Sequence, residues 1–129
     1  MHEYSFSKAE RLTSQRLIGE LFSSGHSFYS MPFRVYWKSG FGAQKGSIQV
    51  AISVPKKTFK RAVDRNRIRR RIREAYRKNK SILHGALTKE RCLFFLLVFA
   101  SEEDLPFSQI EKNLIQTLKR LLSAYEKDL

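Results

Sequence analysis

The chain has 129 residues, of which 42% are apolar, and it carries a formal net charge of +13. This length and composition predict a single domain, residues 1–129, and exclude a disordered chain. One cysteine excludes an intrachain disulfide, and one cysteine with three dispersed histidines excludes a zinc finger.

Neither a secreted nor a membrane protein is predicted. The first twelve residues lack the apolar core of a signal peptide. The longest apolar run, Cys92–Ala100, is too short to span a bilayer, which needs about 20 residues. We therefore expect a cytoplasmic protein that makes no contact with a membrane.

The first predicted element is a helix between Ser14 and Gly25. Serine is a common helix cap at the amino terminus, and glycine often ends helices. Four apolar residues recur between them at helical spacing: Leu17, Ile18, Leu21 and Phe22. From this spacing alone, Ile18 and Phe22 are expected to join the hydrophobic core.

Two strands are predicted next, at residues 32–38 and 47–54, because large apolar side chains alternate with other residues in both. The segment between them, residues 38–47, fits a turn or a hairpin loop. One face of the strands is apolar, and the other carries Arg34, Tyr36, Lys38, Gln49, Ala51 and Ser53. Such a mixed face is either solvated or a platform for an extended ligand.

The segment Lys56–Lys80 holds thirteen of the 25 basic residues and two of the twelve acidic residues, a net charge of +11. A positive charge confined to about one fifth of the chain forms a patch, and such a patch attracts a polyanion.

Part of this segment is predicted to be a helix, because four apolar residues fall within an arc of about 100°: Ile68, Ile72, Ala75 and Tyr76. A disordered basic tail has no reason to keep such a register. A neighbouring arc carries Asn66, Arg69, Arg70, Arg73 and Arg77, which we call the cationic ridge. The planar guanidinium of arginine suits bidentate phosphate contacts and stacking on bases, so the ridge predicts nucleic-acid binding.

A simple solvated face and a membrane-surface helix both fit the basic segment less well. A solvated basic face usually includes acids at i±4, and here only Asp64 and Glu74 interrupt the basic run. A membrane-surface or calmodulin-binding helix needs a wider apolar face. Because no helix–turn–helix pattern precedes the segment, RNA is favoured over duplex DNA by exclusion.

A loop is expected around His84 to Arg91, followed by Cys92–Ala100 as a buried central strand in which Cys92 acts as a small hydrophobe. The last helix is predicted to start near Pro106 or Ser108, where Ser108 and Glu111 fit a capping box. Its apolar stripe consists of Ile110, Leu114, Leu118, Leu121, Leu122 and Tyr125.

These elements give a helix, two or three strands, a helix, a strand and a helix, which predicts an α+β fold. We take the order as α-β-β-β-α-β-α, with a small sheet of about four strands packed with three helices. The chain shows no paired carboxylates, nucleophile triad or metal-ligand spacing. We therefore predict no catalytic residue, and no metal or cofactor bound by the protein alone.

The stretch AVDRNRIRRRIREAYR, residues 62–77, resembles the signature of the bacterial ribonuclease P protein subunit family. The motif stands here as Arg65, Asn66 and Arg67, then Ile68, Arg69 and Arg70, with Arg73 and Glu74 after them. The preceding VAISVPKK resembles the family's strand that ends in a lysine pair. The resemblance extends from Arg11–Leu12 to the final helix.

The resemblance implies a ribosomal-protein-like fold with a left-handed βαβ crossover through the basic helix. It further implies the non-catalytic protein subunit of a ribonucleoprotein endoribonuclease that removes the 5′ leader of precursor tRNA. The RNA subunit would carry the chemistry and would hold most of the Mg²⁺. The implied partners are the catalytic RNA and precursor tRNA, without an obligate protein partner.

The basic segment and the resemblance together predict these RNA-binding residues: Lys56, Lys57, Lys60, Arg61, Arg65, Asn66, Arg67, Arg69, Arg70, Arg73 and Arg77. The resemblance places Ile18, Phe22 and Tyr36 in a cleft for the leader, between the first helix and the sheet. Ser53 shares the mixed face with Tyr36 and is assigned to the same cleft. Ile18 stands where the family often has an aromatic, so we expect only apolar contact there.

Three rival functions stay open on the residues alone. A ribosomal or ribosome-assembly protein would use the same patch for another RNA. A protein-only nuclease would need an active site assembled from distant residues, and a duplex-DNA binder would use the patch for DNA.

Overall fold

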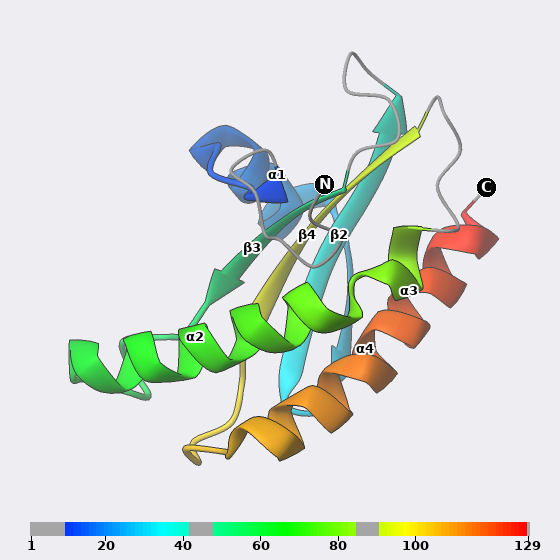
Figure 1. Ribbon diagram of the computed structural model, residues 1–129. Coiled ribbons are helices and arrows are strands. Elements are labelled where there is room, and N and C mark those ends of the chain that lie inside the picture. The colour runs from blue at the N-terminus through cyan, green and yellow to red at the C-terminus, as the bar shows by residue number, and fades with distance from the viewer. Residues whose placement is uncertain (1–9, 42–47, 85–90, 129) are drawn as a thin grey trace.

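The computed structural model describes residues 10–41, 48–84 and 91–128, and Figure 1 shows how their elements are arranged. The strands are β1 (His26–Ser30), β2 (Phe33–Phe41), β3 (Ile48–Ser53) and β4 (Arg91–Phe99). The helices are α1 (Gln15–Ser24), α2 (Ala62–Asn79), α3 (Ser81–His84) and α4 (Phe107–Lys127). The α+β class and the predicted order are confirmed, with the four-residue α3 as an addition.

The strands form one mixed sheet in the order β1-β2-β4-β3. β2 pairs antiparallel with β1 and with β4, whereas β3 pairs parallel with β4. A hairpin between β2 and β3 is therefore wrong, because β4 lies between them. Residues 42–47 of the expected hairpin loop, and residues 85–90 of the expected loop before β4, lie outside the described residues.

The connection from β3 to β4 passes over one face of the sheet. In Figure 1 both strands run downwards, α2 lies in front of them, and β4 is to the right of β3. This arrangement is a left-handed crossover, which agrees with the expectation from the resemblance and is rare among parallel strands.

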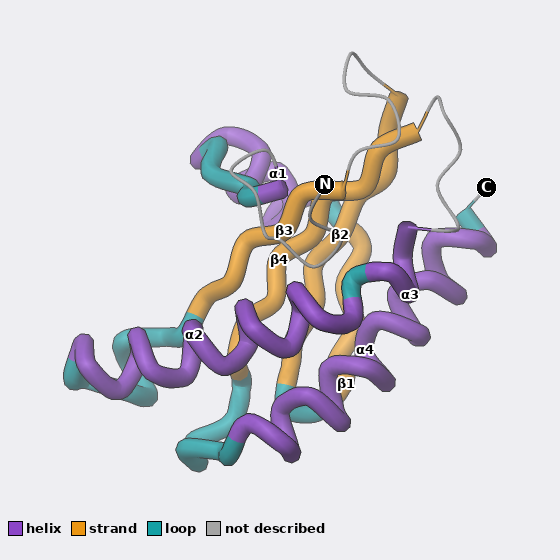
Figure 2. The backbone as a smooth tube through the Cα atoms, in the orientation of Figure 1, coloured by secondary structure: helices purple, strands orange, loops and turns teal. Residues whose placement is uncertain are grey.

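The two faces of the sheet carry separate hydrophobic cores. The larger core lies under α2 and α4, which cover the front face in Figure 2. It contains the apolar face that alternation predicted in β2 and β3, together with Leu93, Phe95, Leu97 and Phe99 of the central strand β4. The smaller core joins Leu12 and Leu21 to Leu96 on the opposite face, beneath α1.

The ends of α1 are those that the sequence predicts. The Ser14 side chain accepts a hydrogen bond from the Leu17 backbone N–H at 3.3 Å. At the other end, a Cβ atom on Gly25 would lie 2.7 Å from the Leu21 carbonyl oxygen, so a larger residue would force the backbone to move. Gly25 is thereby the single residue between the end of α1 and the start of β1.

The expectation from spacing that Ile18 and Phe22 are core residues is wrong for Phe22. Leu21 is buried and Leu17 and Ile18 are half-buried, but Phe22 is 54% exposed. The sheet covers only part of the stripe, so Phe22 lies at the margin of the contact.

The apolar face of α2 is confirmed, because Ile68, Ile72, Ala75 and Tyr76 are all completely buried. The apolar stripe of α4 is also buried, with Leu122 half-buried. The capping box is wrong: Pro106 caps α4 without a side-chain hydrogen bond, and Glu111 instead accepts a hydrogen bond from Asn79 of α2 at 3.0 Å.

Cys92 is buried, as predicted, and it donates a weak hydrogen bond to the Gly40 carbonyl. Across the three described ranges, none of the helices combines the length and the apolar character that a membrane crossing requires.

Candidate nucleic-acid interface

Helix α2 is anchored to the fold by its buried face and by an ion pair at its end. The Lys80 ammonium, which follows the helix, lies 2.7 and 3.0 Å from the two carboxylate oxygens of Glu10. Both side chains are largely shielded from solvent. The segment before α1 is thus tied to the carboxyl-terminal end of α2, which brings Arg11 close to the helix.

One exposed side of α2 is engaged by the loop that precedes α4. Arg67 and Arg71 both donate to the carboxylate of Asp104, and Arg71 also donates to the Leu105 carbonyl. Arg67 binds Asp64 as well, at 2.9 Å. Arg67 lowers the pKa of the Asp104 carboxyl, chiefly through their hydrogen bond. The predicted RNA-binding residue Arg67 is therefore already paired within the protein.

Two further predicted RNA-binding arginines also make contacts within the fold. Arg65 donates to the carbonyls of Phe59 and Lys60, both at 2.9 Å, and so closes the loop between β3 and α2. Arg77 pairs with Glu74, which raises the pKa of the Arg77 guanidinium.

Two members of the cationic ridge remain open to a ligand. Among the described residues, the exposed Arg70 and Arg73 have no hydrogen bond or ion pair. Burial lowers the pKa of Arg73, and the charges of Arg11 and Arg69 lower it further. Arg69 donates to the Asn66 side chain at 2.8 Å. The crowded cations around Arg73 are suited to a phosphate group, which would relieve their repulsion.

The remaining predicted cations lie at the start of this surface. Lys56, Lys57, Lys60 and Arg61 occupy the connection between β3 and α2, and all four side chains are exposed. Arg61 lies 4.0 Å from Asp64, at the limit of an ion pair. The connection leads directly into α2, so these four cations precede those of the ridge in the chain.

The residues predicted to form the leader cleft lie on the sheet face that packs against α1. Strand register places Tyr36, Leu96 and Ala51 in one row across β2, β4 and β3. The Phe22 ring of α1 lies 4.7 Å from the Tyr36 ring, measured between centroids and tilted by 53°. Phe22 and Tyr36 therefore form an aromatic pair at the margin of the helix.

The other two predicted cleft residues lie on the same face. Ile18 packs against the smaller core beside Leu17, and it stays half-buried. Ser53 ends β3 and aligns with Val98 of β4 and Arg34 of β2 in the next row. The structure thus brings all four predicted cleft residues to one face of the sheet.

Some residues of this surface gave no sequence signal. Arg11 lies far from the basic segment in the chain, and Arg71 and Asp104 are 33 residues apart. Val98 lies in the central strand, whose side chains point to both faces, so its apolar run does not show which residues face α1. The β pairing reveals the neighbours of Val98, and the packing of α2 against other segments reveals those of Arg11 and Arg71.

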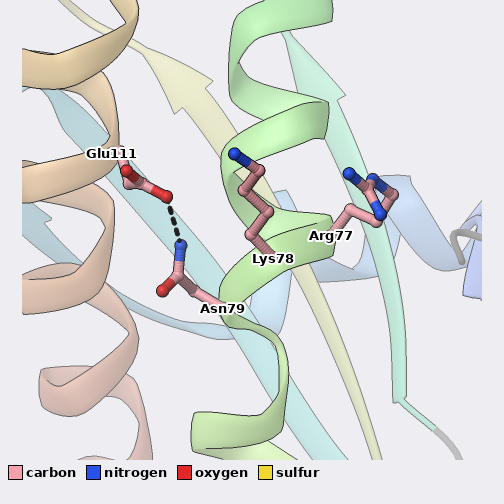
Figure 3. Close-up of a pocket in the computed structure, with 4 residues that line it drawn as sticks. All are labelled: Arg77, Lys78, Asn79 and Glu111. Atoms are coloured by element: carbon pink, nitrogen blue, oxygen red, sulfur yellow. Dashed lines mark hydrogen bonds between the residues drawn. The ribbon is translucent and has the colours of Figure 1, made fainter. Parts of the chain in front are cut away.

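A shallow hollow of about 420 Å³ lies where the end of α2 meets α4. In Figure 3, Asn79 turns towards Glu111 across the hollow, whereas Lys78 and Arg77 extend outwards from α2. Because Asn79 and Glu111 are bonded to each other, this feature is a helix–helix contact with basic residues at its rim.

The described residues do not assemble a metal centre. Within residues 10–41, 48–84 and 91–128, no three His, Cys, Asp or Glu side chains gather closely enough to hold a metal ion.

Comparison with known proteins gives a consistent result. The family model described as Ribonuclease P matches residues 6–122. A curated relative from Porphyromonas gingivalis, named ribonuclease P protein component, is 34% identical over 119 residues, which cover 92% of this chain and 87% of the relative. A relative of the same name from Chlorobium phaeobacteroides is 36% identical over 64% of this chain and 59% of its own length.

Solved structures agree with the fold. The RNase P protein of Staphylococcus aureus matches with a TM-score of 0.65 and 27% identity, covering 88% of this chain and 96% of that protein. The RNase P protein of Thermotoga maritima matches with a TM-score of 0.64 and 25% identity, covering 86% and 96%.

Proposed function

The chain belongs to the ribonuclease P protein family, and from this premise we propose that it binds the catalytic RNA through the cationic ridge and the leader of precursor tRNA through the cleft beneath α1. Family membership makes it a component of ribonuclease P, an endoribonuclease complex of tRNA 5′ maturation that includes an RNA subunit.

The observation that carries the proposal is the pairing state of the α2 arginines. Arg65, Arg67 and Arg71 bind groups within the protein, whereas Arg70 and Arg73 are exposed and have no hydrogen bond or ion pair among the described residues. The charges of cations close to Arg73 also lower its pKa. A phosphate backbone is a suitable ligand, because its successive negative charges can pair with such exposed cations.

The aromatic pair supports a single-stranded ligand in the cleft. Half-exposed aromatic rings bind unpaired bases by stacking, which tolerates many sequences. The Phe22 and Tyr36 rings meet this requirement, and Ser53 offers a hydroxyl for hydrogen bonding. The leader of precursor tRNA is the unpaired segment that the complex must handle.

We further propose that the protein supplies no catalytic group, works as a single domain in the cytoplasm and needs no protein partner. Mg²⁺ would activate the attacking water and stabilise the leaving oxygen, and the RNA would hold it. The support for this division is the motif at residues 65–70, which offers cations for RNA and contains no acidic ligand for a metal.

The test is cleavage of precursor tRNA at low Mg²⁺ by the protein alone, by the catalytic RNA alone and by the two together. We expect cleavage to be much faster with both than with RNA alone, and absent with protein alone. Cleavage by the protein without RNA would overturn the assignment of the chemistry to RNA. No effect of the protein on the RNA's activity would overturn the proposed surfaces, and ribosomal RNA would be the next ligand to examine.

A further inference from the structure

The sheet face that carries the predicted cleft residues continues past Tyr36 to the edge strand β1. β1 is the outermost strand on its side of the described sheet. Its Phe28 and Ser30 side chains contact α4, with Arg120 over the Phe28 ring at 4.7 Å and Ser30 Oγ 2.9 Å from Thr117 Oγ1. Because side chains alternate along a strand, Tyr29 points to the opposite face, which is the cleft face.

Strand register makes Tyr29 the last member of a row that begins in the predicted cleft. Ser53 aligns with Val98, Val98 with Arg34, and Arg34 with Tyr29. The row crosses three strand spacings, or about 14 Å. It runs beside the row that holds Tyr36, since Arg34 and Tyr36 are two residues apart on β2.

Tyr29 and Arg34 form a stacked, solvent-facing pair at the end of this row. The Arg34 guanidinium carbon lies 5.6 Å from the centroid of the Tyr29 ring. Tyr29 is 46% exposed, and the Arg34 side chain is exposed too. A cross-strand cation–aromatic pair alone would stabilise the sheet edge. However, a large half-exposed ring beside an unburied guanidinium offers both a stacking surface and a phosphate contact.

We propose that Tyr29 and Arg34 form a second nucleotide-binding position of the leader cleft, separate from the Phe22–Tyr36 pair. Tyr29 stacks on an unpaired base of the leader, and Arg34 contacts its phosphate or the base itself. The inference rests on the proposed function, because it assigns a further part of the same ligand to the same face of the sheet.

The test measures the affinity of the reconstituted holoenzyme for precursor tRNAs whose leaders are shortened one nucleotide at a time. For the unchanged protein, we expect affinity to rise with leader length in steps. Tyr29→Ala should remove the step of one leader nucleotide and weaken binding of longer leaders about 5- to 10-fold, because stacking on one base supplies an increment of this order. Tyr29→Phe keeps the ring and should retain that step.

Two matched variants assign the effect to the pair. Arg34→Ala should reduce the same step as Tyr29→Ala, and Lys119→Ala should change none, because Lys119 is an exposed cation of α4 on the other side of the sheet. Phe22→Ala should reduce a different step. The melting temperature of each free protein shows whether it folds. If the Tyr29→Ala protein does not fold, Arg34→Ala still tests the proposal.

The possible results distinguish a failure of the second nucleotide position from a failure of the proposed leader cleft. If Phe22→Ala weakens leader binding but Tyr29→Ala and Arg34→Ala do not, the second position is wrong and the cleft stands. If affinity does not depend on leader length at all, the leader cleft itself is wrong. If Tyr29→Ala changes only the oligomeric state of the free protein in sedimentation, the ring belongs to a protein contact and the inference is overturned.

Discussion

The arginines of α2 have different tasks although they are alike in sequence. Arg73 is exposed to solvent at its surface; partial burial lowers its pKa, and the positive charges of Arg11 and Arg69 lower it further. Arg65 instead reaches back to two carbonyls of the preceding loop. One residue is therefore arranged for a ligand and the other for the fold. Their substitution by alanine should give opposite patterns of damage.

Arg73→Ala should weaken binding to the catalytic RNA and leave the melting temperature unchanged, because no described hydrogen bond is lost. The loss of one phosphate contact should cost roughly 1 kcal/mol or more, about fivefold in affinity. Binding is measured by titration of labelled RNA at constant salt. A folded Arg73→Ala protein with unchanged affinity would contradict the assignment of the ridge.

Arg65→Ala should show the reverse, a loss of about 1 kcal/mol in the free energy of unfolding, because two carbonyls of the β3–α2 loop lose their donor. Chemical denaturation measures this loss. At a temperature low enough for the Arg65→Ala protein to be fully folded, its loss of RNA affinity should be smaller than that of Arg73→Ala. An Arg65→Ala protein as stable as the original would show that the two hydrogen bonds contribute little.

Ile72→Asp tests the opposite face of the same helix. Ile72 is completely buried between α2 and the sheet, so the substitution removes an apolar side chain and buries an unpaired charge. The expected loss of roughly 4–5 kcal/mol approaches the whole stability of a small domain. Circular dichroism should show a largely unfolded protein. Arg70→Asp is the control: it should fold normally and bind RNA poorly, because Arg70 is exposed.

At the scale of elements, the contact between α2 and the loop before α4 depends on one carboxylate. Asp104 accepts from Arg67 and Arg71, and the Arg67 hydrogen bond is the main reason that its pKa is lowered. A carboxyl whose pKa is lowered by folding stabilises the folded protein at pH values above its pKa in the unfolded chain, which is near 3.9. This stabilisation is lost as the pH falls through the pKa of the carboxyl in the folded protein.

Asp104→Asn should therefore reduce the free energy of unfolding at pH 7, and the difference from the original protein should vanish at a pH below the folded pKa of Asp104, where both side chains are neutral. The Asp104 side chain is 37% exposed, so solvent screening limits the expected effect to below about 1 kcal/mol. Urea unfolding at both pH values measures it. A difference that persists at low pH would mean that Asp104 acts through packing.

Periodicity predicted the elements whose neighbours are close in sequence. The face of α2 with Ile68 and Ile72, the cap of α1 at Ser14 and the alternation of β2 all follow from local spacing. The β2–β3 hairpin failed because β4, which comes after α2 in the chain, pairs between these strands. The capping box failed because Glu111 bonds to Asn79 on another helix. Contacts between distant segments decided both cases.

The same division holds for the candidate site. The ridge was predictable because its residues share one arc of a single helix. The link from Arg73 to Arg11 and the pairing of Arg67 and Arg71 with Asp104 join segments that are far apart in the chain, and no periodicity encodes them. Phe22 was expected in the core from spacing, and only the resemblance placed it in the cleft.

For the whole molecule, the uneven charge predicts how binding responds to salt. The net charge is +13, and the segment Lys56–Lys80 carries +11 of it. Binding to RNA that neutralises phosphates releases counterions, so the logarithm of the association constant falls linearly with the logarithm of the salt concentration. The slope of this line is proportional to the number of phosphate contacts, whereas contacts to bases do not affect it.

The triple variant Arg69→Ala, Arg70→Ala, Arg73→Ala should make this slope shallower by about two to three, since each phosphate contact contributes roughly 0.7–0.9. Phe22→Ala should weaken the binding of precursor tRNA at every salt concentration without changing the slope, because stacking releases no counterions. Replacing Lys112, Lys119 and Lys127 of α4 by alanine removes the same net charge elsewhere. If that control flattens the slope as much as the ridge variant does, the overall charge of the protein, and not the ridge, determines its attraction to RNA.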